Sequence, residues 1–544
     1  MFYAIVLAYI VYGILFILKT SIVIQGVRYF TLCDDSMISM RYAKNLVHGH
    51  GLVWNPGGAR VEGYTNFLWT IYMAFWHILP ISSAKISLPI QLSGLVFLIS
   101  SLFLIRRIAS HISSEDSYVS MGAVVLTASY QPITYWALKG METSVLGFIV
   151  LLLVWRVIIC LERNSLDIFL FVILGIGLLI RPDMTVLLVG ISLFLIVTLP
   201  EHRMKNAFFT LLIFLLTQGA LMIFRLVYYH DILPNTYYLK MTGVSLILRI
   251  KRGALMGLYF INGMSYFLFA FPFVFSILYR KNKKILFLAY LFLIQFFYSI
   301  YVGGDSWEWW GHLANRFICI VMPLFFILLS LIISSLIKGF ANYKPMADVL
   351  KKACFAILLL LSMIQLHGGF GMDVFRKLVD WPGILIEEEK NNIVLALKLR
   401  EITTPQAKIA VGGAGGTPYF LDRYCIDLLG KNDAFIAHQK TKYERVENWD
   451  PGHNKYDWSY SIGELKPDVV LDYDERWYSP KEIQFFRENY KIFKIRKGMT
   501  TLNSEWVTIY CRGNSSQINW SKGSIVEWPE GHIVQWLGRP PNSL

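Results

Sequence analysis

Long apolar runs recur from the start of the chain to about residue 368, and they constrain its fold more than any other feature. A helix needs about 20 mainly apolar residues to cross a membrane, and inside the bilayer every backbone polar group must be bonded internally. The chain is therefore predicted to be an α-helical polytopic membrane protein with about eleven transmembrane helices. The predicted spans are 3–24, 88–105, 118–137, 143–161, 166–180, 184–199, 206–228, 255–279, 285–302, 317–337 and 353–368.

The first run is longer than the core of a signal peptide and lacks a small-residue cleavage site, so it is expected to stay as the first transmembrane helix. Composition agrees with a membrane protein, because 16% of the 544 residues are charged against about 25% in soluble domains. The net charge of +14 comes mainly from short clusters between apolar runs. That pattern is typical of membrane topology and excludes nucleic acid as a partner.

The apolar run 64–80 is rich in aromatic residues and contains His77 and Pro80. If it does not cross the membrane, the basic clusters all fall on the cytoplasmic side, as the positive-inside rule requires. We therefore predict an interfacial helix there and a cytoplasmic N-terminus. The clusters are Arg106-Arg107, Arg163, Arg203 with Lys205, 280–284 and 338–352.

This topology gathers the unusual polar segments on the outer face, as expected for an active site at a membrane boundary. The segments are Asp34-Asp35, Glu62, 139–142, 181–183, 230–240, 303–316 and the tail from about residue 371. We predict a membrane catalytic domain over 1–370, with a first outer loop over 25–87. An extracytoplasmic mixed α/β domain is predicted over 371–544.

The tail has strand-like runs at 408–411, 468–471, 491–495 and 506–510, and a helical stretch at 386–400. The glycines of 412–416 do not fit the dinucleotide-binding spacing and predict a flexible turn between strand and helix. Cys425 and Cys511 either pair, if the tail is extracytoplasmic, or remain two buried thiols. The six cysteines show no CxxC spacing and imply no metal cluster.

Two adjacent carboxylates, Asp34 and Asp35, follow the first apolar run. One would act as a general base toward an attacking hydroxyl while its neighbour orients it or the acceptor. Alternatively, one of them caps a helix that begins at Ser36. Capping needs only one acid, so the pair favours catalysis.

The string Asp34-Asp35-Ser36-Met37-Ile38-Ser39-Met40-Arg41-Tyr42 continues through 43–46, 49–57 and 61–69. It resembles the first outer loop of a GT-C glycosyltransferase, and more narrowly that of the bacterial terminal arabinofuranosyltransferases and their pilin-modifying relatives. Shorter matches follow in order along nearly the whole chain. They are 139–143, Arg181-Pro182-Asp183, 233–240, Gly303-Gly304-Asp305, 315–317 and 427–433.

The resemblance implies a GT-C fold and a multi-pass enzyme of the bacterial inner membrane, with its active site and C-terminal domain on the periplasmic side. The donor would be a sugar on a polyprenyl phosphate, favoured as arabinofuranose. The acceptor would be a hydroxyl of an envelope glycan or of pilin. It also implies that Asp34 is the base. Met184 stands where the family more often has glycine after Arg-Pro-Asp, and 306–313 is unusually rich in tryptophan; both leave the sugar open.

Cations are needed for the donor phosphate, and arginine suits bidentate contact while lysine acts as a point charge. The alternative for Lys240 and Lys139 is anchoring at the lipid headgroups, and for Arg181 with Asp183 a local ion pair. Arg316 follows Asp305 and Glu308 in one loop. The candidate substrate-binding cations are Lys240, Arg316, Arg181, His312 and Lys139.

Acidic residues complete the predicted site. Glu142 matches a second acid of GT-C enzymes, with a helix N-terminal acid as the alternative. Glu62, Asp183 and Asp305 are also predicted to bind substrate. Carboxylates such as Asp34, Asp35, Glu142 and Asp305 suit a divalent cation, Mg²⁺, Mn²⁺ or Ca²⁺. Separation in sequence does not decide whether they meet, so no cofactor is assigned.

Two other functions compete. A transporter or flippase of lipid-linked sugars would place ionisable groups near mid-membrane, often within internal repeats. No repeat is evident here, and the charges gather at one surface. Within the enzyme class, transfer of a hexose or aminosugar to lipid A or protein is the alternative.

Overall fold

The computed structural model describes residues 1–310, 315–343, 348–366, 383–496, 506–529 and 534–535. The chain forms two compact units, each assembled from separate segments. Unit 1 comprises 1–16, 91–223 and 246–382, and unit 2 comprises 17–90, 224–245 and 383–544. The predicted first outer loop thus groups with the C-terminal region, while the division at 370/371 stays a prediction.

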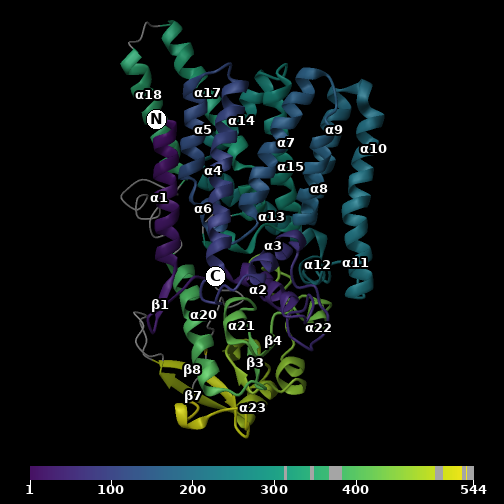
Figure 1. The fold of residues 1–544 in the computed structure, drawn as a ribbon, viewed down its shortest axis with the longest axis vertical. Coiled ribbons are helices and arrows are strands. Elements are labelled where there is room, and N and C mark those ends of the chain that lie inside the picture. Colours follow the sequence, from purple (N-terminus) through teal and green to yellow (C-terminus); the bar gives the residue numbers. More distant parts are fainter. Residues whose placement is uncertain (311–314, 344–347, 367–382, 497–505, 530–533, 536–544) are drawn as a thin grey trace. The chain divides into compact units, whose positions relative to one another are not determined.

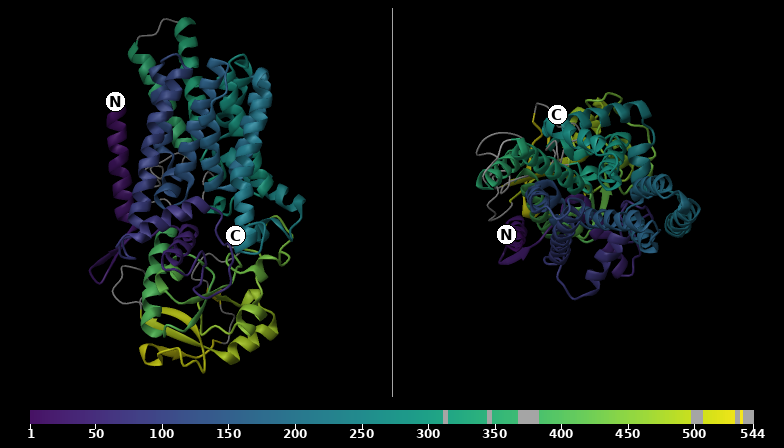
Figure 2. Two further views of the ribbon diagram at one scale, coloured as in Figure 1. Left: turned by 45° about the vertical axis from the view of Figure 1, so that its right-hand side comes forward. Right: turned by 90° about the horizontal axis from the view of Figure 1, so that it is seen from above.

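Unit 1 is a bundle in which α4, α5, α7, α8, α9, α10, α15 and α17 lie side by side (Figures 1 and 2). Its helices coincide with the apolar runs of the sequence. Their bounds are α1 Phe2–Thr20 (which continues into unit 2), α4 Ser87–Ile112 (which begins in unit 2), α5 Ser117–Ser129, α6 Gln131–Leu138, α7 Thr143–Arg163, α8 Ile168–Ile180, α9 Thr185–Thr198, α10 Arg203–Phe214, α11 Ala220–Tyr228 (which ends in unit 2), α13 Leu246–Gly263, α14 Tyr266–Leu278, α15 Lys283–Val302, α16 Arg316–Cys319, α17 Met322–Tyr343 and α18 Asp348–Leu366.

Among the described residues, 6 helices are long and apolar enough to cross a membrane, or up to 7 if one bent pair is a single span. The count of eleven is not confirmed. The run 255–279 is a pair of helices, α13 and α14, bent by 95°, and 118–137 breaks into α5 and α6 at Tyr130. The run 64–80 forms α3 (Phe67–Ile78), which at 12 residues is too short to span; its interfacial position stays a prediction. The protein is a multi-pass membrane protein.

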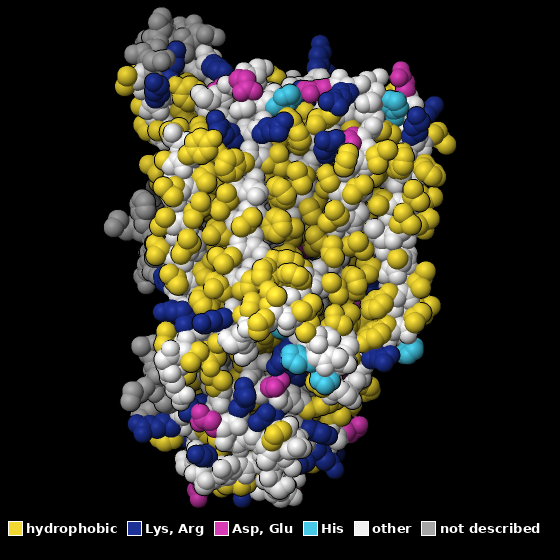
Figure 3. All heavy atoms as spheres, in the orientation of Figure 1, with side chains coloured by type: hydrophobic (Ala, Val, Ile, Leu, Met, Phe, Trp, Pro, Cys, Tyr) yellow, Lys and Arg dark blue, Asp and Glu magenta, His cyan; other side chains and the backbone are white. Residues whose placement is uncertain are grey.

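Charged side chains gather at one end of unit 1, beyond the hydrophobic surface of its helices (Figure 3). Glu162 at the end of α7 accepts from Lys284 of α15 and pairs with His111 of α4. At the same end Lys338 of α17 pairs with Asp116, which caps α5. Lys284 and Lys338, which belong to two of the predicted basic clusters, thus pair with acidic residues at this end of unit 1, while the cytoplasmic location of the clusters stays a prediction.

Unit 2 contains a mixed sheet of six strands in the order β4-β3-β5-β8-β7-β9, in which β4, β3 and β5 are parallel and the remaining pairs antiparallel. The predicted strands and helix of the tail are confirmed. The bounds in this unit are β1 Ile22–Ile24, β2 Val27–Tyr29, α2 Asp34–Val47, α3 Phe67–Ile78, α12 Asn235–Met241, α20 Gly383–Ile402, β3 Lys408–Val411, α21 Gly416–Leu421, β4 Tyr424–Asp427, α22 Ala434–Ala437, β5 Val469–Val470, β6 Tyr473–Asp474, α23 Pro480–Asn489, β7 Tyr490–Arg496, β8 Trp506–Arg512, β9 Ser524–Val526 and β10 Val534–Gln535.

The first loop packs against this sheet through buried polar groups. The side-chain amide of Asn55 bonds to the backbone of Cys425 as a neighbouring strand would: it donates to the Cys425 carbonyl at 2.8 Å and accepts from the Cys425 N–H at 3.0 Å. Arg41 of α2 donates to Asn55 Oδ1 at 2.7 Å and to the carbonyl of Arg423 at 2.8 Å. Cys425 and Cys511 are both free and buried, so the pairing alternative is wrong. The strands β3 and β5 lie between theirs.

Candidate active site

Asp34 and Asp35 form the first turn of α2, where the positive end of the helix dipole favours carboxylates. The helix begins at Asp34 with Cys33 at the N-cap position, and Cys33 makes no side-chain capping bond. The alternative in which an acid caps a helix beginning at Ser36 is therefore wrong. Both acidic side chains project from α2 itself.

Asp34 is held by the glycine-rich turn between β3 and α21. Its Oδ1 accepts from the N–H of Gly415 at 3.0 Å and of Gly416 at 2.8 Å. A Cβ on Gly415 would lie 1.8 Å from the Asp34 carbonyl oxygen, so only glycine permits this approach. The predicted strand-to-helix turn is confirmed, and the need for its glycine at 415 is steric.

Asp35 pairs with a lysine from the next loop of the sheet. Lys431 Nζ lies 2.9 Å from Asp35 Oδ1, and the two side chains are 13% and 23% exposed. Lys431 follows β4, as Gly415 follows β3, and these strands are parallel neighbours. The α2 carboxylates thus lie at the carboxyl ends of adjacent parallel strands, where α/β sheets commonly bind ligands.

The charges of this cluster are interdependent. Burial raises the pKa of Asp34, although Lys431 and the N–H of Gly416 act in the opposite direction. Burial lowers the pKa of Lys431, but the carboxylates of Asp35 and Asp34 outweigh it and hold that pKa above its ordinary value. The lysine therefore stays protonated beside a carboxylate of raised proton affinity, and such a carboxylate is a better general base near neutral pH.

Glu62 and Lys240 also lie in unit 2. Glu62 forms a bidentate ion pair with Arg225, with Nε–Oε2 at 2.7 Å and Nη2–Oε1 at 3.2 Å. Burial raises the pKa of Glu62 despite this partner. Lys240 of α12 packs on Gly452, where a Cβ would come within 3.0 Å of its Cε.

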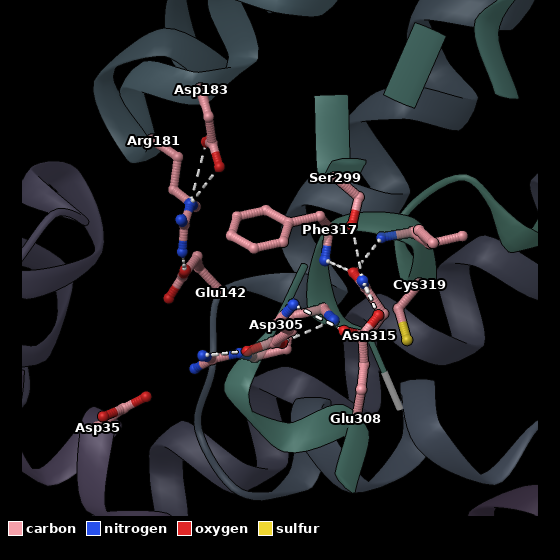
Figure 4. Close-up of polar contacts among 12 residues, drawn as sticks. Asp35, Glu142, Arg181, Asp183, Ser299, Asp305, Glu308, Asn315, Phe317 and Cys319 are labelled. Atoms are coloured by element: carbon pink, nitrogen blue, oxygen red, sulfur yellow. Dashed lines mark hydrogen bonds and ion pairs between the residues drawn. The ribbon is translucent and has the colours of Figure 1, made fainter. Parts of the chain in front are cut away.

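Unit 1 brings three of the predicted residues into one cluster. Arg181 donates to Glu142 at 2.5 Å and, through Nε, to Asp183 at 3.0 and 3.1 Å (Figure 4). Glu142 is 1% exposed and Arg181 20% exposed. The local ion pair considered as an alternative for Arg181 is present, and it extends to a second acid that precedes α7.

Asp305 and Arg316 form a second pair in unit 1. Arg316 binds both Asp305 oxygens at 2.8 Å. Glu308 accepts from the Asp305 N–H at 2.9 Å and from the Asn315 side chain. Burial raises the pKa of Glu308 to about 8. The Arg316 guanidinium also lies over the Trp136 ring, 5.3 Å from its centroid.

Sequence reasoning gave no role to several members of these clusters. Lys431 lies inside the matching string 427–433, so its position was a signal, but nothing there indicated Asp35 as its partner. Arg225 lies within a predicted span, and nothing in the sequence around it indicated that it pairs with Glu62. Lys139 is fully buried after α6, and His312 lies outside the described residues.

No group of three or more His, Cys, Asp or Glu side chains within the described ranges is arranged to hold a metal ion. The carboxylates of unit 1 and unit 2 described above are instead engaged by arginine, lysine and backbone N–H groups. No step is assigned to a divalent cation.

Three comparisons place this architecture among known proteins. Residues 384–510 match a family described as a domain of unknown function, DUF8728. A terminal β-(1→2)-arabinofuranosyltransferase of Mycobacterium tuberculosis is 26% identical over 222 residues, which are 38% of this chain and 35% of that protein. The match thus spans about a third of the curated relative's length.

Among solved structures, ArnT of Cupriavidus metallidurans bound to undecaprenyl phosphate aligns with a TM-score of 0.54 at 9% identity, over 95% of this chain and 98% of that one. The Archaeoglobus fulgidus oligosaccharyltransferase aligns with a TM-score of 0.49 at 9% identity, over 97% and 76%. The likeness to ArnT concerns the fold, because the identity is low. The chain therefore has the fold of ArnT, as the predicted GT-C fold required. The predicted sequence resemblance to a terminal arabinofuranosyltransferase is found over 222 residues.

Proposed function

We propose that this protein is an inverting GT-C glycosyltransferase that uses a polyprenyl-phosphate sugar donor and a hydroxyl acceptor. The observation that carries the proposal is the carboxylate pair at the start of α2, held by Gly415, Gly416 and Lys431. The GT-C fold and the partial match to an arabinofuranosyltransferase support it. Arabinofuranose is the favoured sugar, and an envelope glycan or pilin the favoured acceptor.

The proposed step is a single displacement. The acceptor oxygen attacks the anomeric carbon, the bond from that carbon to the phosphate oxygen breaks, and the phosphate leaves with the electron pair. Asp34 takes the acceptor proton through Oδ2, since Oδ1 is occupied by two N–H groups. A phosphate leaving group needs charge stabilisation more than a strong acid. Arg181, Arg316, Lys240 and His312 are proposed for that role.

The remaining predicted residues are proposed to orient the reactants and the cations. Glu142, Asp183 and Asp305 fix the arginine side chains through the ion pairs of unit 1, and Glu62 fixes Arg225. Asp35 orients Asp34 or the acceptor. The site and the C-terminal domain are proposed to face the periplasm from the bacterial inner membrane.

Asp34→Asn tests the base assignment. Asparagine retains an oxygen that accepts from Gly415 and Gly416, so expression and membrane insertion should persist while transfer is lost. Transfer is measured in proteoliposomes with synthetic polyprenyl-phosphate arabinofuranose. Asp422→Asn, at a side chain that is 62% exposed, is the matched control and should transfer normally. Wild-type rates in Asp34→Asn would overturn the assignment of the base.

The sugar and acceptor are identified by mass spectrometry of envelope glycans and pilins from a deletion strain. Loss of a pentose from one of them supports the favoured specificity. Loss of a hexose or an aminosugar would replace it. Movement of the lipid-linked sugar across the vesicle membrane without cleavage would instead identify a flippase.

A further inference from the structure

A loop of the C-terminal sheet, 428–433, carries Lys431 to the first turn of α2 and is held from several directions. Asp427 accepts through Oδ1 from the N–H of Leu429 at 3.0 Å and of Gly430 at 3.1 Å, and through Oδ2 from the N–H of Asn432 at 2.7 Å. These bonds close the loop on the end of β4. The backbone on both sides of Lys431 is therefore fixed by one buried carboxylate.

Two other elements of unit 2 fix the same loop. The Asn235 amide of α12 donates to the carbonyls of Gly430 and Lys431, each at 2.9 Å. The Tyr42 hydroxyl of α2 lies 3.0 Å from Asn432 Oδ1. Tyr42 and Asn235 come from segments far from the loop in sequence. Lysine is a flexible side chain, so this support is what fixes the origin of its ammonium group.

The ammonium group of Lys431 lies where it can offset the repulsion between two carboxylates. Two carboxylates on adjacent residues repel each other, and in a partly buried place one of them tends to hold a proton. Lys431 Nζ, at 2.9 Å from Asp35 Oδ1, offsets that repulsion. The titratable groups with the largest effect on the lysine are Asp34 and Asp35 of α2 and Asp427 of β4. The Cys33 thiol at the start of α2 interacts in turn with Asp35 and with Glu389 of α20.

We propose that Lys431 is a positioning residue that keeps both α2 carboxylates ionised and holds Asp35 in place, so that Asp34 is free to accept a proton. This inference rests on the proposed function for its catalytic consequence. The ion pair itself is independent of that function. Lys431 touches neither donor nor acceptor in this role.

The pH dependence of transfer by the full-length protein in proteoliposomes tests the proposal. A positive charge lowers the pKa of neighbouring carboxylates, so its removal in Lys431→Met raises them. The acid limb of the kcat profile should move to higher pH by about one unit or more. Activity should be lost first on the acid side of the profile and recover as the pH rises, with little change in KM for the acceptor. Lys431→Arg, which keeps the charge, should restore most of the profile.

Lys44→Met is the matched control. Lys44 lies on the same helix but pairs with Asp422, whose side chain is 62% exposed, so this variant should keep the wild-type profile. A uniform loss of activity in Lys431→Met, with no movement of the acid limb, would show a merely structural role and overturn the proposal.

Thermal unfolding separates this proposal from the proposed function. The decrease in Tm caused by Lys431→Met should be larger at pH 8, where the carboxylates are ionised, than at pH 4. That result with no transfer in the wild type would reject the glycosyltransferase proposal and keep the ion pair. An equal decrease at both pH values would reject the ion pair's role.

Discussion

Arg225 Nε lies 2.7 Å from Glu62 Oε2, and each side chain is 3% exposed. A buried pair of this kind is costly to break from one side, because the remaining charge has no partner and no water. Glu62 also accepts the backbone N–H of Asn235 through its carbonyl at 3.0 Å. The pair therefore supports the residue that holds the Lys431 loop.

Arg225→Met should destabilise the protein by about 3–5 kcal/mol, since it leaves Glu62 buried and uncompensated. Arg225→Met combined with Glu62→Gln should recover much of that loss. The measurement is thermal unfolding in detergent. Lys44→Met, which breaks a pair whose aspartate, Asp422, is 62% exposed, is the control and should cost about 0–1 kcal/mol. A double variant no more stable than the single one would contradict the assignment.

Glu308 should make unit 1 less stable as the pH rises. Its pKa is raised by burial from 4.5 to about 8, so between these values the folded state holds a proton that the unfolded state lacks. Stability contributed by this group is full below about pH 4.5 and is lost as the pH passes 8. Glu308→Gln should remove this decline in stability. Measuring Tm from about pH 5 to about pH 9 would reveal the difference between the variant and the wild type. An unchanged decline would assign the proton to another group.

Arg316→Lys should weaken use of the donor, because lysine cannot bind both oxygens of Asp305 and has no planar fork for a phosphate. We expect kcat/KM for the polyprenyl-phosphate sugar to fall by about tenfold or more, the size of one lost bond to a charged group. Arg476→Lys is the control. Arg476 also pairs with an aspartate, Asp474, but its side chain is 60% exposed. Equal effects of the two substitutions would remove Arg316 from the site.

Gly415→Ala should separate α2 from the loop after β3. The added Cβ would meet the Asp34 carbonyl oxygen at 1.8 Å, and a backbone atom cannot turn aside as a side chain does. Overpacking of this kind costs about 1–3 kcal/mol, and transfer should fall because Asp34 loses its two donors. Gly463→Ala, with nothing within 4 Å of its added Cβ, should leave transfer unchanged. Circular dichroism and transfer assays on both variants provide the test.

Local patterns in the sequence were enough to predict most of the secondary structure. Apolar length predicted the helices of unit 1, and strand-like runs predicted β3, β5, β7 and β8. Helix breaks were missed, as at Tyr130 between α5 and α6, because hydropathy averages over a whole span. The adjacent carboxylates Asp34 and Asp35 could be found from the sequence because charged residues beside an apolar run stand out in any hydropathy window.

Tertiary structure alone decided which groups surround these two carboxylates. Lys431 is 396 positions from Asp35, and Gly416 is 382 positions from Asp34. No local periodicity links residues so far apart. Their meeting depends on the parallel pairing of β3 with β4 and on a glycine that lets α2 approach the sheet. The sequence by itself determined that two adjacent carboxylates follow the first apolar run. Packing of the first loop on the C-terminal sheet determined their counter-ion, their hydrogen bonds and hence the proton affinity of Asp34.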